Sequence, residues 1–111
     1  MFTSLVQITV PKPLSNESVR EIFDRTSPDY LGVKGLVRKY YLVSEDRLTI
    51  GGCYLWETKA DAERIYTPEW RKLVVERYGG PEPTVTFYET NIVVETAEHR
   101  IDTHWPEQVV A

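Results

Sequence analysis

Hydrophobic and polar residues alternate along four stretches of the chain, a period that is typical of β-strands. The first covers residues 2–10 and ends at Pro11. The second and third, residues 36–43 and 48–57, flank a short polar loop and predict a hairpin. The fourth, residues 84–95, is rich in β-branched residues and contains Asn91 as a candidate bend.

Apolar residues recur at helical spacing between the first and second strands. Val19, Ile22 and Phe23 fall on one face of a predicted helix. Ser15 and Asn16 are candidate N-caps, and residues 18–21 also fit a capping box, so the helix starts at either of two positions one turn apart. Pro28 ends the helix because the residue before a proline avoids helical angles.

A second helical region lies between the third and fourth strands. Thr58 and the pair Thr67-Pro68 are both N-cap signals, so the region predicts two short helices or one kinked helix. Gly79 ends the region as a helix-terminating glycine.

The resulting order is β-α-β-β-α-β, which predicts an α+β fold of the ferredoxin-like kind. This fold is an antiparallel four-stranded sheet with two helices on one face. We assign residues 1–96 to this domain. Residues 97–111 show no clear period, and we interpret them as a C-terminal tail that could contact a partner subunit.

Composition narrows the class of protein. The 111 residues suffice for one domain, and the net charge of −4 offers no basic cluster for nucleic acid or an anionic membrane. Cys53 is the only cysteine, so no intrachain disulfide can form. No apolar segment is long enough to span a bilayer, and the first residues lack a basic leader. We therefore expect a cytoplasmic protein with no membrane partner.

The third strand contains the most informative sequence of the chain. Alternation puts Gly52, Tyr54 and Trp56 on one face, and Cys53 and Leu55 on the other. We interpret the Cys53 side as the helix-covered core, which turns the two aromatic residues toward the helix-free face.

The other strands complete this face by the same reasoning. If Leu36 and Leu42 point toward the helices, five further side chains join Tyr54 and Trp56 on the helix-free face: Gln7, Lys39, Tyr41, Thr86 and Tyr88. This set predicts an amphipathic pocket for a flat organic ligand. The alternative is that the aromatic residues form the core of an interface between two sheets, and the two interpretations are compatible.

Two motifs in residues 35–56 resemble a known family. The run Gly35-Leu36-Val37-Arg38-Lys39 is followed, after a short acidic loop, by Gly51-Gly52-Cys53-Tyr54-Leu55-Trp56. This pattern resembles the dimeric α/β-barrel superfamily, and it is most similar to the small mono-oxygenases of the YdhR type. The likeness in element order covers residues 1–96, and the tail lies outside it.

The resemblance implies a function but does not fix the reaction. Members of the superfamily include cofactor-free oxygenases of quinol-like aromatics, muconolactone-type isomerases, polyketide cyclases and haem-degrading enzymes. We expect a cofactor-free mono-oxygenase that acts on a small aromatic or quinol-like substrate. A non-catalytic dimer that binds a small ligand, or an isomerase or cyclase of the same superfamily, are the alternatives.

In an oxygenase of this kind, Lys39 is the candidate base or anion stabiliser, because burial can lower the pKa of a lysine towards neutrality. Tyr54 is the second candidate catalytic residue, since its hydroxyl could hydrogen-bond the substrate oxygen. The competing interpretations are an ordinary surface lysine on an edge strand and a tyrosine that only packs.

Metal and nucleic-acid sites are not expected. His99 and His104 are the only histidines, and they lie five residues apart in the predicted tail without a carboxylate cluster. An RNA-recognition module shares the element order and exposes aromatic residues on its sheet. However, this chain is acidic and lacks the basic-glycine-aromatic opening of that motif.

The same face assignment predicts a homodimer. Two helices can cover only one face of the sheet, and a monomer that exposed Tyr41, Tyr54, Trp56 and Tyr88 on the other would be poorly soluble. Packing two such faces together would form a barrel-like core, with residues 92–94 reaching the partner's edge.

Overall fold

The sheet consists of the four predicted strands, and each pair of neighbouring strands is antiparallel. The computed structural model describes residues 1–106 and orders the strands β2-β3-β1-β4. Their bounds are β1 Phe2–Thr9, β2 Leu36–Val43, β3 Thr49–Trp56 and β4 Thr84–Glu89. The βαββαβ order and the ferredoxin-like α+β class are therefore confirmed.

Side-chain caps set where the helices begin. The helices are α1 Asn16–Thr26, α2 Lys59–Glu63 and α3 Pro68–Tyr78, and the 3-10 turn η1 spans Ser27–Tyr30. The hydroxyls of Ser15, Thr58 and Thr67 each accept a backbone N–H of the helix that follows. The second helical region thus forms two short helices, one of the two predicted alternatives. Gly79 ends α3 at a φ of 72°, a left-handed conformation that glycine adopts without strain.

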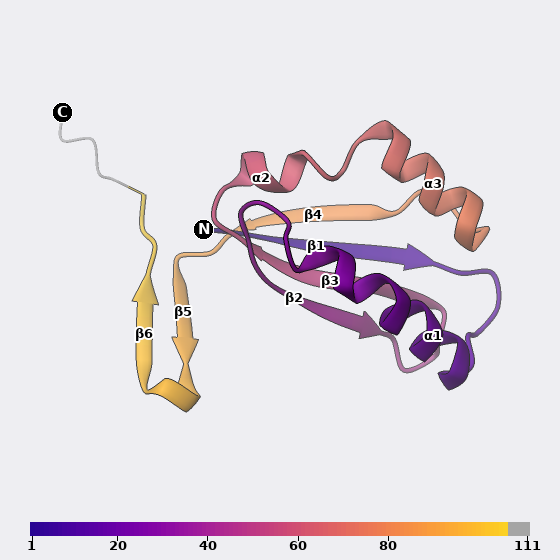
Figure 1. Cartoon of the computed structure of the whole chain (residues 1–111), viewed down its shortest axis with the longest axis horizontal. Coiled ribbons are helices and arrows are strands. Elements are labelled where there is room, and N and C mark those ends of the chain that lie inside the picture. Colours follow the sequence, from indigo (N-terminus) through magenta and orange to yellow (C-terminus); the bar gives the residue numbers. More distant parts are fainter. Residues whose placement is uncertain (107–111) are drawn as a thin grey trace.

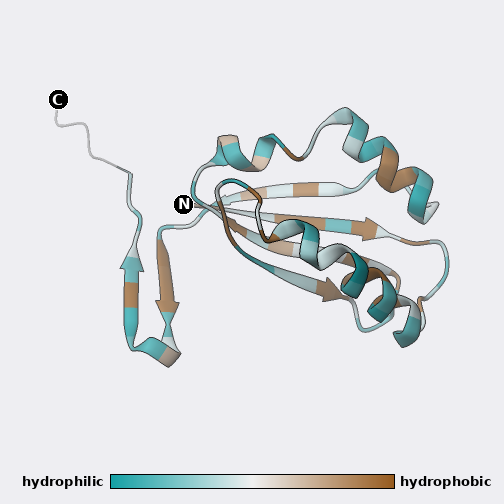
Figure 2. Cartoon of the chain, viewed as in Figure 1, coloured by the Kyte–Doolittle hydropathy of each residue, from teal (hydrophilic) through white to brown (hydrophobic). Residues whose placement is uncertain are grey.

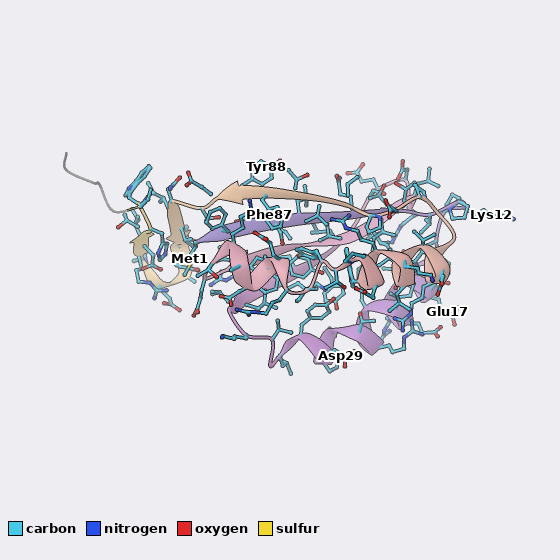
Figure 3. All side chains as sticks on the ribbon, turned by 90° about the horizontal axis from the view of Figure 1, so that it is seen from above. Met1, Lys12, Glu17, Asp29, Phe87 and Tyr88 are labelled. Atoms are coloured by element: carbon cyan, nitrogen blue, oxygen red, sulfur yellow. The ribbon has the colours of Figure 1, made fainter. Side chains whose placement is uncertain are left out.

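The helices lie on one face of the sheet, and none of the described helices covers the opposite face (Figure 1). Two neighbours on β4 show the difference, because Phe87 points toward the helices and Tyr88 points away from them (Figure 3). Phe87 packs against the buried core, whereas Tyr88 remains 54% exposed. No helix within residues 1–106 is long and apolar enough to cross a membrane.

The core under the helices contains a buried polar network. Trp56 and Ser4 are both fully buried. The indole Nε1 of Trp56 donates to Ser4 Oγ at 2.9 Å, and the Tyr66 hydroxyl lies 2.7 Å from the same oxygen. Because every polar atom of the group has a partner, these residues can be buried at little cost.

The prediction that Tyr54 and Trp56 face away from the helices is wrong. Both are buried in the core beneath α2 and α3, with Tyr54 only 3% exposed. Cys53, which we expected in the core, lies on the helix-free face and is partly exposed. Leu42, expected to face the helices, is 42% exposed on that same face.

On β3, the inversion comes from taking the side of Cys53 and Leu55 as the core, whereas the larger rings of Tyr54 and Trp56 fill it. On β2, a β-bulge puts Leu36 and Leu42 on opposite faces. The pairing of β2 with β3 shifts between Leu36 and Arg38, so that Val37 is an extra residue. Leu36 does pack against the core as predicted. However, the bulge changes the alternation after it. Lys39 and Tyr41 therefore lie on the same face as Leu36, whereas Leu42 lies on the opposite face.

The chain after β4 also differs from the prediction. It bends at Asn91 and forms an antiparallel hairpin of β5 Ile92–Glu95 and β6 Arg100–Thr103, with the 3-10 turn η2 Thr96–Glu98 between them. Part of the expected tail is therefore a strand, while residues 107–111 of that tail lie outside the described residues.

The hairpin projects from the end of the sheet (Figure 1). Its strand β5 is strongly hydrophobic (Figure 2). The radius of gyration is 15.9 Å, against about 13 Å for a compact domain of this length. An ion pair between Arg38 and Glu95, 2.6 Å apart, connects the hairpin to β2.

Candidate functional site

A cavity of about 340 Å³ lies between the sheet and the two long helices. Strands β1, β2 and β3 form its floor, and α1, η1 and α3 form its walls. Its lining is mainly aromatic and aliphatic, with a few polar groups. The apolar part includes Val6, Ile8, Ile50, Phe23, Tyr30, Tyr41, Tyr54, Trp70, Leu73 and Val74, and the polar part includes Thr26, Asp29 and Lys39. An apolar cavity with few polar groups is typical of small-molecule sites.

Lys39 is the central polar group of this cavity. Its Nζ lies 3.3 Å from the ring centre of Tyr30, 3.9 Å from that of Tyr41 and 4.5 Å from that of Tyr54. Lys39 forms no salt bridge within the described residues 1–106, although Asp29 lines the same cavity. The amine is thus enclosed by ring faces, and no carboxylate among these residues pairs with its charge.

This enclosure controls the protonation of the amine. Burial lowers the pKa of Lys39 from 10.5 to about 7, because the ammonium loses hydration that the neutral amine does not need. The ring faces of the three tyrosines act in the opposite direction by attracting the cation. Near neutral pH, Lys39 therefore exists in both protonation states and can exchange a proton with a bound molecule.

The register of the sheet places Lys39 beside Tyr54. Residues directly opposite each other in antiparallel strands share a face, and one such row crosses the sheet from Lys39 to Tyr54, Ser4 and Phe87. Burial raises the pKa of Tyr54 far above its usual value. Its hydroxyl therefore stays protonated and can donate a hydrogen bond.

Helix α1 fixes the orientation of Tyr41. The Thr26 hydroxyl donates its only proton to the Ile22 carbonyl at 2.9 Å, so Thr26 Oγ1 can only accept in any further hydrogen bond. The Tyr41 hydroxyl lies 3.0 Å from Thr26 Oγ1 and donates to it. Burial raises the pKa of Tyr41, which keeps this donor protonated.

Gly52 has no side chain, and Lys39 and Tyr54 occupy the space that a side chain at this position would need. A Cβ at this position would lie 3.1 Å from Lys39 Cε, 3.1 Å from Tyr54 Cε1 and 2.9 Å from the Tyr40 carbonyl oxygen. These distances are tighter than ordinary contacts, so any side chain here would displace the lysine or the tyrosine.

The structure brings together some predicted site residues and separates others. Lys39, Tyr41 and Tyr54 line the cavity, and Gly52 pairs with Tyr41 in the sheet. Trp56 shares their face but is fully enclosed in the core and does not line the cavity.

The remaining predicted residues do not reach the cavity. Gln7, Thr86 and Tyr88 lie on the helix-free face, as predicted, since Gln7 pairs with Gly51 and Thr86 with Leu5 in the sheet. The cavity lies on the opposite face, so these three residues do not line it. His99 and His104 are on the hairpin and at its end, and neither lines the cavity.

Sequence reasoning missed the residues that the helical side contributes. Tyr30 makes the shortest contact with Lys39, and Thr26 orients Tyr41. Both lie at the junction of α1 and η1, where no periodic pattern indicates which side chains face the sheet.

Solved structures with this fold include bacterial proteins described as oxygenases. A monooxygenase from the gene ActVA-Orf6 of Streptomyces coelicolor, solved with the ligand nanaomycin D, superimposes with a TM-score of 0.60 at 18% identity. That match covers 81% of this chain and 87% of the other. The fold is shared with monooxygenases of this type.

Two further structures agree. A Deinococcus radiodurans protein assigned by inference as an antibiotic biosynthesis monooxygenase matches over 86% of this chain and 97% of its own, with a TM-score of 0.62 and 11% identity. SnoaB, a cofactor-independent oxygenase from Streptomyces nogalater, matches over 81% and 92%, with a TM-score of 0.57 and 15% identity. At these identities the likeness establishes the fold, which is the fold that the sequence motifs indicated.

No protein-family model matches this chain. No curated protein matches it either.

Proposed function

We propose that this protein is a cofactor-free mono-oxygenase that oxidises a small phenol or quinol in the cavity around Lys39. The observation that carries the proposal is an amine with a pKa of about 7, enclosed by three tyrosine rings in a cavity large enough for an aromatic substrate. The shared fold with oxygenases supports it at the level of architecture.

The reaction balances without a cofactor. A phenol with a free para position and one molecule of dioxygen give a para-quinone and one molecule of water. The substrate supplies all four electrons, and one oxygen atom enters the ring while the other leaves as water. The protein has to bind the ring, remove a proton from its hydroxyl, and exclude bulk water.

Lys39 takes the first proton in this mechanism. The neutral amine accepts the phenolic proton, and the resulting ammonium lies beside the phenolate that it has produced. The phenolate is the electron-rich species that reduces dioxygen. Because a general base works best with a pKa near the working pH, a value of about 7 suits Lys39 to this task.

Tyr54 and the other ring faces position the substrate. The protonated Tyr54 hydroxyl can donate a hydrogen bond to the developing phenolate, which lowers its energy. Tyr30 and Tyr41 provide flat apolar surfaces beside the amine, and Gly52 keeps the floor between them low. The cavity thus supplies binding and proton transfer, and the substrate supplies the redox chemistry.

Oxygen consumption during exposure to a panel of phenols, naphthols and quinols tests the proposal, with no flavin or metal added. We expect at least one compound with a free para position to be converted to a para-quinone that carries one oxygen atom from dioxygen, and Lys39→Met to reduce the rate by about a hundredfold, the usual share of a general base. The matched control is Lys72→Met, on the exposed surface of α3.

The alternatives give different outcomes. Turnover without oxygen would indicate an isomerase or cyclase, and binding without turnover would indicate a ligand-binding protein. An unchanged rate in Lys39→Met would remove Lys39 from the mechanism.

We also propose that the protein works as a homodimer joined through its helix-free sheet faces. Tyr40, Leu42 and Tyr88 are 55%, 42% and 54% exposed there, and the partly buried Leu5 and Leu55 lie beside them. Together these residues form an apolar patch that a second copy would cover. Light scattering across a dilution series is the test, and a mass that stays at 12.9 kDa would contradict the dimer.

A further inference from the structure

A second, larger cleft opens next to the Lys39 cavity. It has a volume of about 850 Å³ and lies between the segment after β1, helix α1 and the end of α3. Ile22, Arg77 and Tyr78 line both spaces, so the cleft and the Lys39 cavity adjoin along these three residues. A ligand in the cavity can therefore extend into the cleft.

The cleft has a positive charge that contrasts with the rest of the chain. Lys12, Arg25 and Arg77 line it, against the single carboxylate of Glu21, which leaves a formal charge of +2 (three minus one). The whole chain has a net charge of −4. Lys12 lies at the end of the molecule where α1 begins and α3 ends (Figure 3).

Within residues 1–106, these three cations have no carboxylate partners of their own. The salt bridges in this part of the chain involve Arg20, Arg38, Arg64 and Arg100, and none involves the three cations of the cleft. Three separate elements supply the cations: the loop after β1, α1 and α3. A set of cations from separate elements, unpaired and facing one cleft, is suited to binding an anion rather than to stabilising a single helix.

We propose that the substrate is an aromatic carboxylate whose phenolic ring occupies the Lys39 cavity and whose carboxylate lies in the basic cleft. This inference rests on the proposed function for the position of the ring. Arginine pairs with carboxylates through two parallel hydrogen bonds, which fixes the direction of the ligand as well as its affinity. The phenolic oxygen then points at Lys39 because the acid end is held at the opposite end of the site.

The size of the cleft agrees with an extended ligand. A carboxylate alone would leave most of 850 Å³ empty, so the space accommodates a second ring or an alkyl chain between phenol and acid. We therefore expect the hydroxyl and the carboxylate to be on opposite ends of the substrate. A salicylate-like acid, with both groups on neighbouring carbons, should bind poorly.

A matched pair of ligands tests this charge preference. The rigid 6-hydroxy-2-naphthoic acid and its methyl ester have the same ring and differ by one negative charge at the end far from the hydroxyl. We expect calorimetry to show that the acid binds about tenfold more tightly than the ester, the effect of one charge-assisted hydrogen bond or more. Raising the salt concentration should reduce the ratio, because the cleft is open to solvent.

The variant Arg25→Gln/Arg77→Gln should lower the affinity for the acid to that for the ester. Arg20→Gln is the matched control, since Arg20 is an exposed α1 residue that pairs with Asp24 and does not line the cleft. Circular dichroism of each variant verifies that it is folded. The single variant Arg25→Gln, which should lose part of the preference, replaces the double variant if that fails to fold.

Equal binding of acid and ester, no binding of the acid, or a preference that survives in the double variant would overturn the proposal. Because binding is measured without turnover, the result is independent of the oxygenase test. A charge preference with this acid, together with no oxygen consumption by any compound of the oxygenase panel, would retain the anion site and reject the proposed reaction.

Discussion

Both faces of the sheet carry aromatic residues, but the surroundings of these residues differ. The helix-covered face encloses Tyr54 and Trp56, together with Lys39, whose pKa falls near neutrality. The opposite face carries Tyr40 and Tyr88, each about half exposed. Aromatic residues alone therefore do not mark the functional face.

The difference lies in what each aromatic ring encloses. On the covered face, Tyr30, Tyr41 and Tyr54 surround an amine and leave a cavity beside it. On the open face, Tyr40 and Tyr88 are about half exposed and line no part of the Lys39 cavity. Our proposals therefore place the chemistry on the first face and self-association on the second.

The adjacent residues Phe87 and Tyr88 give the largest expected contrast between the faces. Phe87→Ala removes a ring that packs against Tyr66 and the buried core, and we expect it to lower the free energy of unfolding by about 3 kcal/mol. Tyr88→Ala should cost less than about 1 kcal/mol in the dilute protein, because the side chain is 54% exposed. Urea denaturation measures both.

A reversed order, with Tyr88→Ala the more damaging, would mean that the open face forms the stable core. If the homodimer forms, Tyr88→Ala should in addition shift light scattering toward the monomer, and Phe87→Ala should not do so at temperatures where it remains folded.

Ser4→Ala tests the polar network inside the covered face. The substitution leaves Trp56 Nε1 without its acceptor in a site closed to water, and we expect a loss of about 2 kcal/mol. Thr86→Ala, one pair further along the sheet on the open face, should change stability by about 0.5 kcal/mol or less. Similar losses in the two variants would show that the Ser4 network contributes little.

Lys39→Met should raise the free energy of unfolding, and the size of this gain should depend on pH. The pKa of Lys39 is about 7 in the folded state and about 10.5 when unfolded, so the unfolded chain binds more protons between these values. The cost of burying the ammonium is complete below pH 7 and disappears as the pH rises to 10.5.

We therefore expect Lys39→Met to gain about 1 to 2 kcal/mol at pH 6, a range that allows for the attraction of the ring faces and for partial exposure. The gain should vanish near pH 10.5. Thermal denaturation at both pH values, with Lys72→Met as the control, measures it, and a loss of stability at pH 6 would indicate that the rings hold the cation more strongly than burial disfavours it.

Much of the fold could be predicted because its signals are local. Thr58 and Thr67 predicted the starts of α2 and α3, Ser15 was one of several candidate starts for α1, and Gly79 predicted the end of α3. The hairpin of β5 and β6 was missed because Arg100–Thr103 is too short and too polar for its alternation to stand out. Its pairing with β5 depends on a contact between segments, not on either segment alone.

For the site, the sequence predicted which strand residues lie together, but not the face on which they lie or the helical residues around them. Alternation correctly grouped Gly52, Tyr54 and Trp56, and Lys39 and Tyr41 do share their face. Their orientation was inverted because Cys53 and Leu55 were taken as the core side of β3. Leu36 was separated from Lys39 and Tyr41 because one extra residue at Val37 changes the alternation of β2, and no residue in that run signals a bulge. The walls from α1 and η1 depend on tertiary packing, which a period within one element does not determine.

The central claim is that the helix-covered cavity holds an amine that titrates near neutrality. Carbon-13 labelling of lysine Cε, followed by NMR from pH 5 to 11, measures this directly, and the resonance missing from Lys39→Met identifies the residue. The account predicts a midpoint for Lys39 near 7, far below the ordinary lysine value of 10.5. A midpoint near 10.5 would contradict it.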